Sequence, residues 1–582
     1  MKPRSLRYYL PDWSIMAVAV ISLIIIYLMV WRTDAPGHGS VIDGDGKDYY
    51  SYLVSVFITH DLGHQDTSQW YITQTPTGTI NIHTIGVAMM LLPFFAIACM
   101  WAYFKGVPVN GFSYPFEMMI SIGALVYVLI GLFFLHRFLQ LFNVKKRTAS
   151  LMVLLVFFGT NLIHYSLIEP TMSHVYSFSL IAAFLYYAKR LFDQPLPRYT
   201  IISAMLLGLI TLIRPANILV VLALPLLSEN FSTFLQTLRQ IVIRNYRSFI
   251  VAAFLFASVF FLQAIVWFTQ NGRFIQWTYR NNGFYFLHPR MLKMLFGFNG
   301  GFFIYTPVFL LFFIGIISWY RTNRFQALAM FFFTLFLFYF LSSYCAYTYN
   351  DGLSIRPLCD FYSLLVIPGA MLFNTAMGAL VKTLVFSLSF FALFINLIYC
   401  YQYKTGILQA SGMNYRKWSY VFLHTGEKYR NILGGCDDLQ PYSTVPVSPA
   451  FSNDSSGVIT VNDSVPFTNL FVRQQLGFNT NKIFVTIKMK VKEICAGASR
   501  NASLLIKTWS PKNKTENVQT FRIDDVPFDQ CCSWNEEEYT VMMTGNMNSD
   551  DQFVVLALNQ NGQQFALSDF HIDVFNYNYQ QK

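Results

Sequence analysis

Long apolar stretches recur through the first two thirds of this sequence, and each is long enough to cross a lipid bilayer. A crossing helix needs about 20 apolar residues, because lipid offers no partner for backbone polar groups. Only 12% of the 582 residues are charged and 54% are hydrophobic, so lipid must surround most of the chain. The pattern predicts about eleven membrane-spanning helices, at 12–32, 114–138, 148–166, 172–189, 199–213, 215–229, 248–268, 302–320, 326–344, 361–380 and 383–402.

Short basic loops separate these stretches and predict their orientation. The positive-inside rule assigns such loops to the cytoplasm, and with all of them inside the spans alternate, with the N-terminus inside and the C-terminus outside. The net charge of +11 therefore reflects topology, and no nucleic-acid partner is expected. The first stretch lacks a small-residue cleavage site and should remain as a helix. The basic groups are Lys2/Arg4/Arg7, Lys145/Lys146/Arg147, Lys189/Arg190/Arg198, Arg239/Arg244/Arg247, Arg321/Arg324 and Lys382.

One apolar stretch, at 85–103, does not fit this alternation. A crossing there would place the basic group at 145–147 outside. We interpret the stretch as a helix in the outer interface, bent by Pro93. The alternative is a true span, which would invert the topology of everything downstream.

The last part of the chain is polar and strand-like. Within 482–491, apolar and polar residues alternate, and similar short runs recur between Asn, Asp, Gly and Ser turns. We therefore predict a membrane domain at 1–402 with its first outer loop at 33–113, a linker at 403–429, and an all-β sandwich or jelly roll at 430–582. An even number of cysteines in this outer part fits two disulfides, namely Cys436, Cys495, Cys531 and Cys532.

Three acids, Asp43, Asp45 and Asp48, follow the first span directly. Carboxylates crowded beside a membrane are costly unless they bind a cation, pair with a base or take part in proton chemistry. An enzyme acting on a lipid-borne substrate at the outer face needs a carboxylate at this place. The alternative is a solvated acidic turn.

Other polar groups fall in segments that the topology places outside. Glu169 and His174 flank a helix mouth, where they can contact phosphate or sugar hydroxyls, or simply cap the helix. Arg214 lies between two apolar runs and needs an anion, either a lipid phosphate or a carboxylate of the protein. Arg290 and Lys293 suit phosphate oxygens, with snorkelling to headgroups as the alternative.

A last polar group lies near the outer end of a later span, where Arg356 precedes Asp360 by four residues. On an α-helix such residues share a face, so we expect the two to pair. Arg356 would then face the same outer cavity as the three acids.

Taken together, these stretches resemble the GT-C glycosyltransferase superfamily, in particular a bacterial mannosyltransferase-like branch of the Bacteroidota type. The resemblance covers the membrane part in order, and the outer sandwich more weakly resembles a carbohydrate-binding module. The matching stretches are Asp45-Gly-Lys-Asp-Tyr-Tyr-Ser-Tyr-Leu, Gly86-Val-Ala-Met-Met-Leu-Leu-Pro-Phe-Phe, Glu169-Pro-Thr-Met-Ser-His-Val-Tyr-Ser-Phe, Ile213-Arg-Pro-Ala-Asn, Tyr305-Thr-Pro and Asn350-Asp-Gly-Leu-Ser-Ile-Arg.

The resemblance implies transfer of a sugar, with inversion, from a polyprenyl phosphate or diphosphate carrier to a glycan, lipid or protein acceptor. The reaction would take place at the outer, periplasmic face of a bacterial cytoplasmic (inner) membrane. The family's general base falls on Asp45, with Asp43 and Asp48 as close substitutes. His83 stands near the place of a lysine found in relatives and is a candidate phosphate contact. No organic cofactor and no fixed metal site are implied, although a divalent cation at Asp43 and Asp45, as in some oligosaccharide-transferring relatives, stays open.

The rival interpretation is a lipid-linked sugar flippase without catalysis. Transporters place ionisable residues at mid-membrane and show internal repeats. In this sequence the charges gather in the outer segments and no repeat is visible. The enzyme is therefore the favoured interpretation.

Overall fold

The computed structural model divides the chain into two compact units, Met1–Leu397 and Ile398–Lys582. It describes residues 12–30, 41–42, 44–65, 71–276, 278, 283–349, 352–375, 377–408, 413, 415–426, 429, 449–462, 467–493, 502–511, 515–522, 534–559 and 564–576. The predicted membrane domain lies almost wholly in the first unit, and the predicted linker and sandwich lie in the second.

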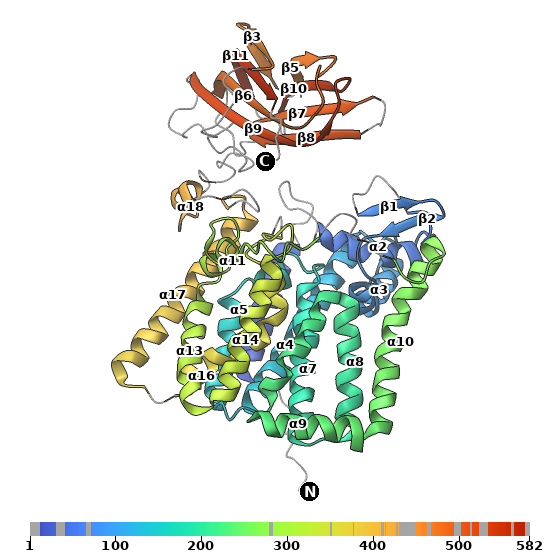
Figure 1. Cartoon of the computed structure of the whole chain (residues 1–582), viewed down its shortest axis with the longest axis vertical. Helices are drawn as coiled ribbons and strands as arrows, with labels where there is room; N and C mark the ends of the chain where they lie inside the picture. Colours follow the sequence, from blue (N-terminus) through green and yellow to red (C-terminus); the bar gives the residue numbers. More distant parts are fainter. Residues whose placement is uncertain are drawn as a thin grey trace. The chain divides into compact units, whose positions relative to one another are not determined.

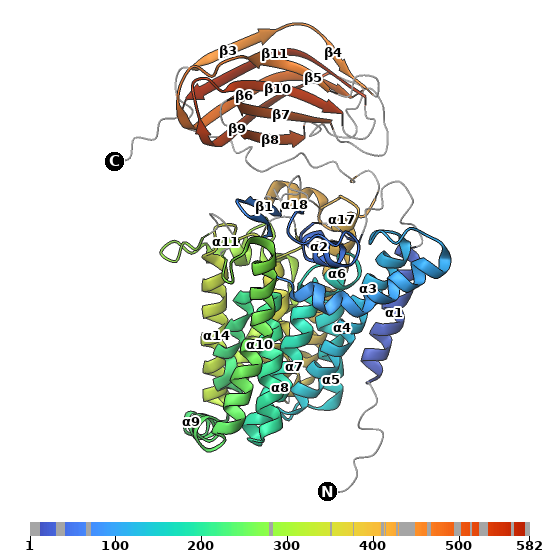
Figure 2. The same cartoon turned by 90° about the vertical axis from the view of Figure 1, so that its right-hand side faces the viewer.

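The first unit is a helical bundle, in which α4, α7, α8 and α10 run roughly side by side (Figures 1 and 2). Its helices are α1 (Trp13–Val30), α2 (Asp45–Phe57), α3 (Gly86–Lys105), α4 (Tyr114–Gln140), α5 (Lys146–Phe158), α6 (Leu162–Leu167), α7 (His174–Asp193), α8 (Pro197–Ile213), η2 (Pro215–Leu227), α9 (Phe231–Arg239), η3 (Gln240–Arg244), α10 (Tyr246–Asn271), α11 (Met291–Phe296), α12 (Phe302–Tyr305), α13 (Val308–Thr322), α14 (Arg324–Ser342), η4 (Arg356–Phe361), α15 (Tyr362–Leu365), α16 (Ile367–Asn374) and α17 (Ala379–Lys404).

Among the described residues, six helices are long and apolar enough to cross a membrane. A seventh is added if the bent pair 215–227 and 231–244 counts as one span. The first unit is therefore the membrane part of a multi-pass protein, but the predicted number of eleven is not confirmed. The six are Gly86–Lys105, Tyr114–Gln140, Tyr246–Asn271, Arg324–Ser342, Arg356–Asn374 and Ala379–Lys404.

Several predicted spans are broken helices. The stretch 148–166 becomes α5 and α6, because α5 ends at Gly159. The stretch 302–320 becomes α12 and α13 on either side of Pro307, whose ring removes a backbone donor. The stretch 215–229 forms the 3₁₀-helix η2, which contains Pro215 and Pro225. Apolar composition predicted that these segments are buried in lipid or protein, but it could not predict where each helix breaks.

The segment between α1 and α4 forms one end of the bundle. A small hairpin of β1 (Ile72–Thr75) and β2 (Gly78–Asn81) follows α2, and α3 then runs across the end of the bundle rather than along it (Figure 2). By length and composition alone α3 could also span, so the sequence did not separate the two readings of 85–103. Pro93 lies inside α3, as expected.

The second unit contains two antiparallel sheets. One has the strand order β5-β10-β7-β8 and the other β3-β11-β6-β9, with β4 pairing with β11. The strands are β3 (Phe451–Ser455), β4 (Ile459–Val461), β5 (Phe467–Arg473), β6 (Thr480–Glu493), β7 (Ala502–Ser510), β8 (Thr515–Arg522), β9 (Asn535–Met547), β10 (Gln552–Asn559) and β11 (Phe565–Asn576), and a short helix α18 (Tyr415–Val421) precedes them.

One hydrophobic core joins the two sheets. It takes Leu504 and Ile506 from one sheet and Ile483, Val485 and Ile487 from the other, all of them fully buried. The predicted alternation in 482–491 is therefore confirmed, since its apolar face lines this core. The described strands make a sandwich, and a jelly-roll order is not confirmed. The four cysteines of the predicted disulfides lie outside the described residues. Among the residues that the structure describes, Cys99, Cys345, Cys359 and Cys400 form no disulfide.

Candidate active site

The first turn of α2 meets a distant segment of the chain through an ion pair. Nη2 of Arg356, at the start of η4, lies 2.8 Å from Oδ2 of Asp45, the first residue of α2. The Asp45 side chain is 25% exposed and that of Arg356 13%, so the pair is partly shielded from water. The structure thus places together the two residues that the sequence analysis expected to share one cavity.

Glycine makes this approach of α2 possible. Gly44, just before the helix, has φ +54°, a conformation that glycine adopts without strain. A Cβ atom added at Gly46 would lie 1.9 Å from Oγ1 of Thr171, so only glycine lets α2 pack this closely against the loop before α7. Thr171 in turn donates a hydrogen bond to the carbonyl of Val41.

Asp45 is a carboxylate that stays charged. Burial opposes its ionisation, but the neighbouring positive charges, first that of Arg356 and then those of His83 and Arg214, outweigh burial and lower its pKa. The carboxylate also stands at the N-terminus of α2, where the helix dipole favours a negative group.

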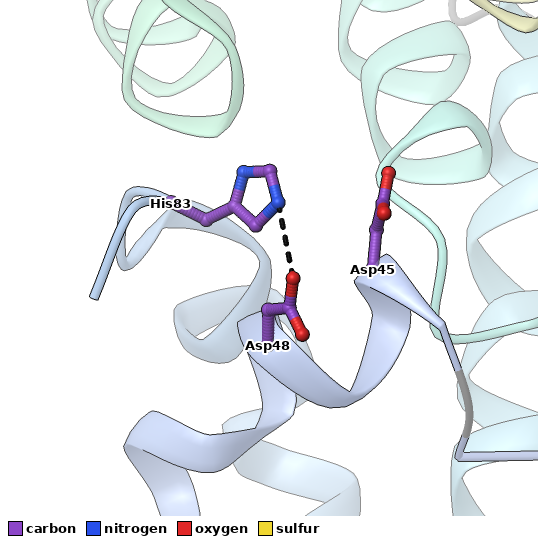
Figure 3. Close-up of side chains that lie close together, drawn as sticks. All are labelled: Asp45, Asp48 and His83. Carbon is purple, nitrogen blue, oxygen red and sulfur yellow. Dashed lines mark ion pairs between the residues drawn. The ribbon is translucent and has the colours of Figure 1, made fainter. Parts of the chain in front are cut away.

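Asp48 lies one turn further along α2, and its pKa is shifted in the opposite direction. It is fully buried, and its Oδ2 lies 3.3 Å from Nε2 of His83 (Figure 3). Burial raises its pKa to about 6, although the hydrogen bond and charge of His83 act in the other direction. Two carboxylates on one helix turn therefore differ in affinity for a proton, a pattern typical of acid–base sites.

His83 is held firmly in its place. Its ring stacks on Tyr49 at 4.4 Å, and its backbone N–H donates to Oδ1 of Asn81. The amide of Asn81 donates to the carbonyl of Asp48, while the hydroxyl of Tyr52 donates to the carbonyl of His83. These bonds tie the segment after β2 to α2 and fix the distance between imidazole and carboxylate.

Asp45, Asp48 and His83 could together hold a divalent cation. Each offers one ligand atom, and the three atoms lie within 4.8 Å of one another (Figure 3). Oδ1 of Asp48 is buried and accepts no hydrogen bond from the described residues, so the set has an oxygen available for a ligand. The sequence predicts no fixed metal site and leaves a divalent cation at Asp43 and Asp45 open. Asp43 lies outside the described residues.

A second cluster surrounds the buried carboxylate of Asp360. Nδ1 of His174 lies 2.7 Å from its Oδ1, while Nη1 of Arg214 lies 3.5 Å from its Oδ2. The amide of Asn217 donates to Oδ2 as well, at 2.8 Å, and also to the hydroxyl of Ser177. Of the two partners that the sequence left open for Arg214, the structure shows the carboxylate.

A further acid, Glu169, pairs with His164 at 3.2 Å between Oε1 and Nε2. Burial opposes its ionisation, but the charges of His164 and Arg356 lower its pKa. The charge of Arg356 therefore lowers the pKa of both Glu169 and Asp45. Nη1 of the same arginine contacts Sδ of Met172 at 3.7 Å. These contacts place the loop before α7 beside the Asp45–Arg356 pair.

The expected pairing of Arg356 with Asp360 is wrong. Both lie in η4, a 3₁₀-helix, in which residues three apart rather than four apart share a face. The two side chains consequently point to different partners, Arg356 to Asp45 and Asp360 to His174.

Arg290 and Lys293 were also predicted to contact phosphate. Arg290 lies over the ring of Tyr347 at 5.1 Å, and Lys293 follows in α11. Within the described ranges neither residue forms an ion pair with an acid of the clusters above. Their expected role in binding phosphate is left as a prediction.

Two residues of these clusters, His164 and Asn217, were not predicted from the sequence. His164 was read as part of a membrane span, although an ionisable residue in such a span signals a functional or paired site. Asn217 follows Arg214 in the same short motif and was not singled out. A search for polar residues inside apolar stretches would have found both.

Comparison with known proteins gives only distant structural likenesses. No protein-family model and no curated protein sequence matches the chain. The oligosaccharyltransferase of Archaeoglobus fulgidus in its apo form matches with a TM-score of 0.39 and 14% identity, over 70% of this chain and 57% of that one. The same enzyme tethered to an acceptor peptide matches with a TM-score of 0.38, 13% identity and the same coverage.

A third solved structure, arabinosyltransferase EmbB from Mycobacterium smegmatis, matches with a TM-score of 0.38 and 11% identity. That match covers 99% of this chain and 66% of EmbB, so this chain spans less than two thirds of the length of each of these proteins. All three structures are of proteins named as sugar transferases.

Proposed function

We propose that this chain is a GT-C-type membrane glycosyltransferase that moves a sugar from a polyprenyl phosphate or diphosphate carrier to an acceptor hydroxyl. The observation that carries the proposal is the Asp45–Arg356 ion pair, which unites an acid after the first helix with a guanidinium from η4. A base for the acceptor and a cation for the leaving phosphate are the two groups that this reaction requires.

In the reaction, the oxygen of the acceptor attacks the anomeric carbon while the bond from that carbon to the carrier phosphate breaks. Asp45 takes the proton of the attacking hydroxyl, and the carrier phosphate leaves with the bonding electrons. Attack from the face opposite the leaving group inverts the anomeric configuration. Arg356, assisted by Arg214, stabilises the negative charge that grows on the phosphate.

Binding of the donor would itself prepare the base. In the structure Arg356 lowers the pKa of Asp45, so an unliganded Asp45 is a weak base. A phosphate that attracts Arg356 adds negative charge beside Asp45 and draws away its cation. Both effects raise the pKa of Asp45 and make it a stronger base once the donor is in place.

A divalent cation at Asp45, Asp48 and His83 would add a positive charge near the leaving phosphate. The protein's own residues would still bind and orient the donor. The proposed location is a bacterial inner membrane, with the site and the β unit on the periplasmic side and with glycan, lipid or protein as the acceptor. These finer points come from the sequence resemblance and the distribution of charge.

The direct test is Asp45→Asn in the purified full chain, reconstituted in lipid nanodiscs. A synthetic polyprenyl-phosphate mannose serves as the first donor probe, because the resemblance is to mannosyltransferase-like enzymes, and release of free polyprenyl phosphate is measured. We expect turnover to fall about 100-fold or more, the usual contribution of a general base.

Asp61→Asn is the matched control, since Asp61 lies in the same outer segment but is paired with His64, and its side chain is half exposed. Undiminished turnover of Asp45→Asn would remove Asp45 from the role of base. Movement of the lipid-linked sugar across proteoliposomes, without release of carrier phosphate, would favour the flippase instead.

A further inference from the structure

The end of the bundle opposite α2 carries a second polar arrangement that the proposed reaction does not use. Here α7 ends, α8 begins, and α9 with η3 runs across the bundle (Figure 1). Tyr199 and Ile241 pack together with Leu191 in a small hydrophobic cluster, so α8, η3 and α7 are joined at this point. The amide of Asn245 also donates to the carbonyl of Pro195.

Two arginines converge on one tyrosine at this junction. Nη2 of Arg190 and Nη2 of Arg198 both donate to the hydroxyl of Tyr199, at 3.0 and 3.2 Å. Both guanidinium groups also lie over the ring of Tyr199, at 5.6 and 4.8 Å from its centre. The nearby acid Asp193 is engaged by Lys189 at 2.5 Å. Two guanidinium groups that converge on one hydroxyl bring several N–H donors to one place, an arrangement that suits a phosphate.

The neighbouring helix has the features of one that lies in a membrane interface. Phe234 anchors α9 by stacking on Phe192 at 5.7 Å. Phe231 and Leu235 are 59% and 48% exposed on the same helix, and Ile243 in η3 is 62% exposed. A helix that lies across the end of an apolar bundle and exposes large apolar side chains rests at the level of the lipid headgroups.

More arginines surround this helix. Arg239, Arg244 and Arg247 are exposed along α9, η3 and the start of α10. Together with Arg190 and Arg198 they form a basic surface at headgroup depth, which we name the α9 surface. Its charge complements that of acidic lipid headgroups.

We propose that the α9 surface binds the phosphate headgroup of an anionic phospholipid, with Arg190 and Arg198 as the two arms of the site and Tyr199 as the group that holds them together. The apolar side chains of α9 enter the adjoining acyl region. The site is separate from the proposed transfer reaction and does not depend on it.

The test measures lipid binding by native mass spectrometry of the delipidated full chain in detergent, titrated with phosphatidylglycerol or with phosphatidylcholine. The wild type should bind phosphatidylglycerol more tightly. In the double variant Arg190→Gln/Arg198→Gln, phosphatidylglycerol binding should weaken roughly 30-fold, and phosphatidylcholine binding should not change.

Arg324→Gln is the matched control, because Arg324 is a single exposed arginine over a tyrosine, Tyr320, at 5.6 Å. It should leave the affinity for phosphatidylglycerol within about twofold of the wild type. Tyr199→Phe keeps both arginines and removes only the shared hydroxyl, so it should give an intermediate loss. If the double variant does not fold, the affinity of Tyr199→Phe for phosphatidylglycerol is measured in its place, and an unchanged affinity would contradict the proposal.

Three other outcomes would overturn the proposal. The first is equal affinity of the wild type for the two lipids, and the second is unchanged phosphatidylglycerol binding in the folded double variant. The third is displacement of phosphatidylglycerol from the α9 surface by a lower concentration of polyprenyl phosphate, which would make this a site for the carrier lipid.

Discussion

Replacing Asp48 by Asn should change how the stability of the protein depends on pH. Asp48 is fully buried, and burial raises its pKa from 3.8 to about 6. Between about pH 4 and pH 6 the folded protein therefore keeps a proton that the unfolded chain has already released. A group of this kind contributes most to stability below the pKa of the unfolded state, and its contribution falls as pH rises through the folded pKa.

The magnitude follows from the two pKa values. The difference between 3.8 and about 6 corresponds to at most about 3 kcal/mol, at about 1.36 kcal/mol per pH unit. Asn has nearly the shape of Asp and cannot ionise, so the stability of the variant does not fall in this way as the pH rises. Compared with the wild type, Asp48→Asn should gain up to about 3 kcal/mol of relative stability between pH 4 and pH 7.

Two measurements check this reasoning. Thermal unfolding of both proteins at a series of pH values gives the relative stability. Infrared difference spectra follow the C=O stretch of a protonated carboxyl, which should disappear with a midpoint near pH 6 in the wild type and be missing from the variant. A midpoint near pH 4, or the same pH dependence of unfolding in both proteins, would refute the assignment of a buried, proton-holding Asp48.

Three further predictions concern the same site. Gly46→Ala should destabilise the fold by roughly 1–3 kcal/mol in thermal unfolding, because its Cβ would meet Oγ1 of Thr171 at 1.9 Å. The control Gly63→Ala should not destabilise the fold, because its Cβ meets its nearest atom at 3.6 Å. Arg356→Gln should lower kcat/KM for the donor about 100-fold or more and shift the acid limb of the pH–rate profile upward, because its paired carboxylate loses a cation. Asp360→Ala should cost about 3 kcal/mol in unfolding experiments, since an arginine and a histidine lose their buried partner; a loss below about 1 kcal/mol would contradict this.

The multi-pass membrane part and the strands of the second unit could be predicted from the sequence. Apolar length and scarcity of charge depend only on composition along the chain, and they indicated a multi-pass membrane part. Alternation with a period of two predicted β6, whose residues Ile483 and Ile487 are buried in the core of the sandwich. Both patterns are local in the sequence. A local pattern predicts the folded element correctly when one face of that element must be buried.

The pairing of charges could not be predicted in the same way. Arg356 and Asp360 are close in sequence, so an α-helical spacing suggested a pair, but the local conformation is a 3₁₀-helix. The partners that the structure shows, Asp45 for Arg356 and His174 for Asp360, come from remote segments. Sequence spacing carries no information on which remote segment approaches, because that choice depends on the packing of whole helices.

The arrangement of partners singles out one acid among those at the site. Asp48, Glu169 and Asp360 each pair with a histidine, and Asp360 pairs with Arg214 as well, so each of these acids keeps a partner in the protein when an arginine binds phosphate. Asp45 pairs with Arg356, and a guanidinium binds phosphate through two parallel hydrogen bonds at least as well as it binds a carboxylate. Arrival of an anionic donor therefore changes the surroundings of Asp45 more than those of the other acids. The proposed base is therefore the acid whose counter-ion the proposed donor can attract.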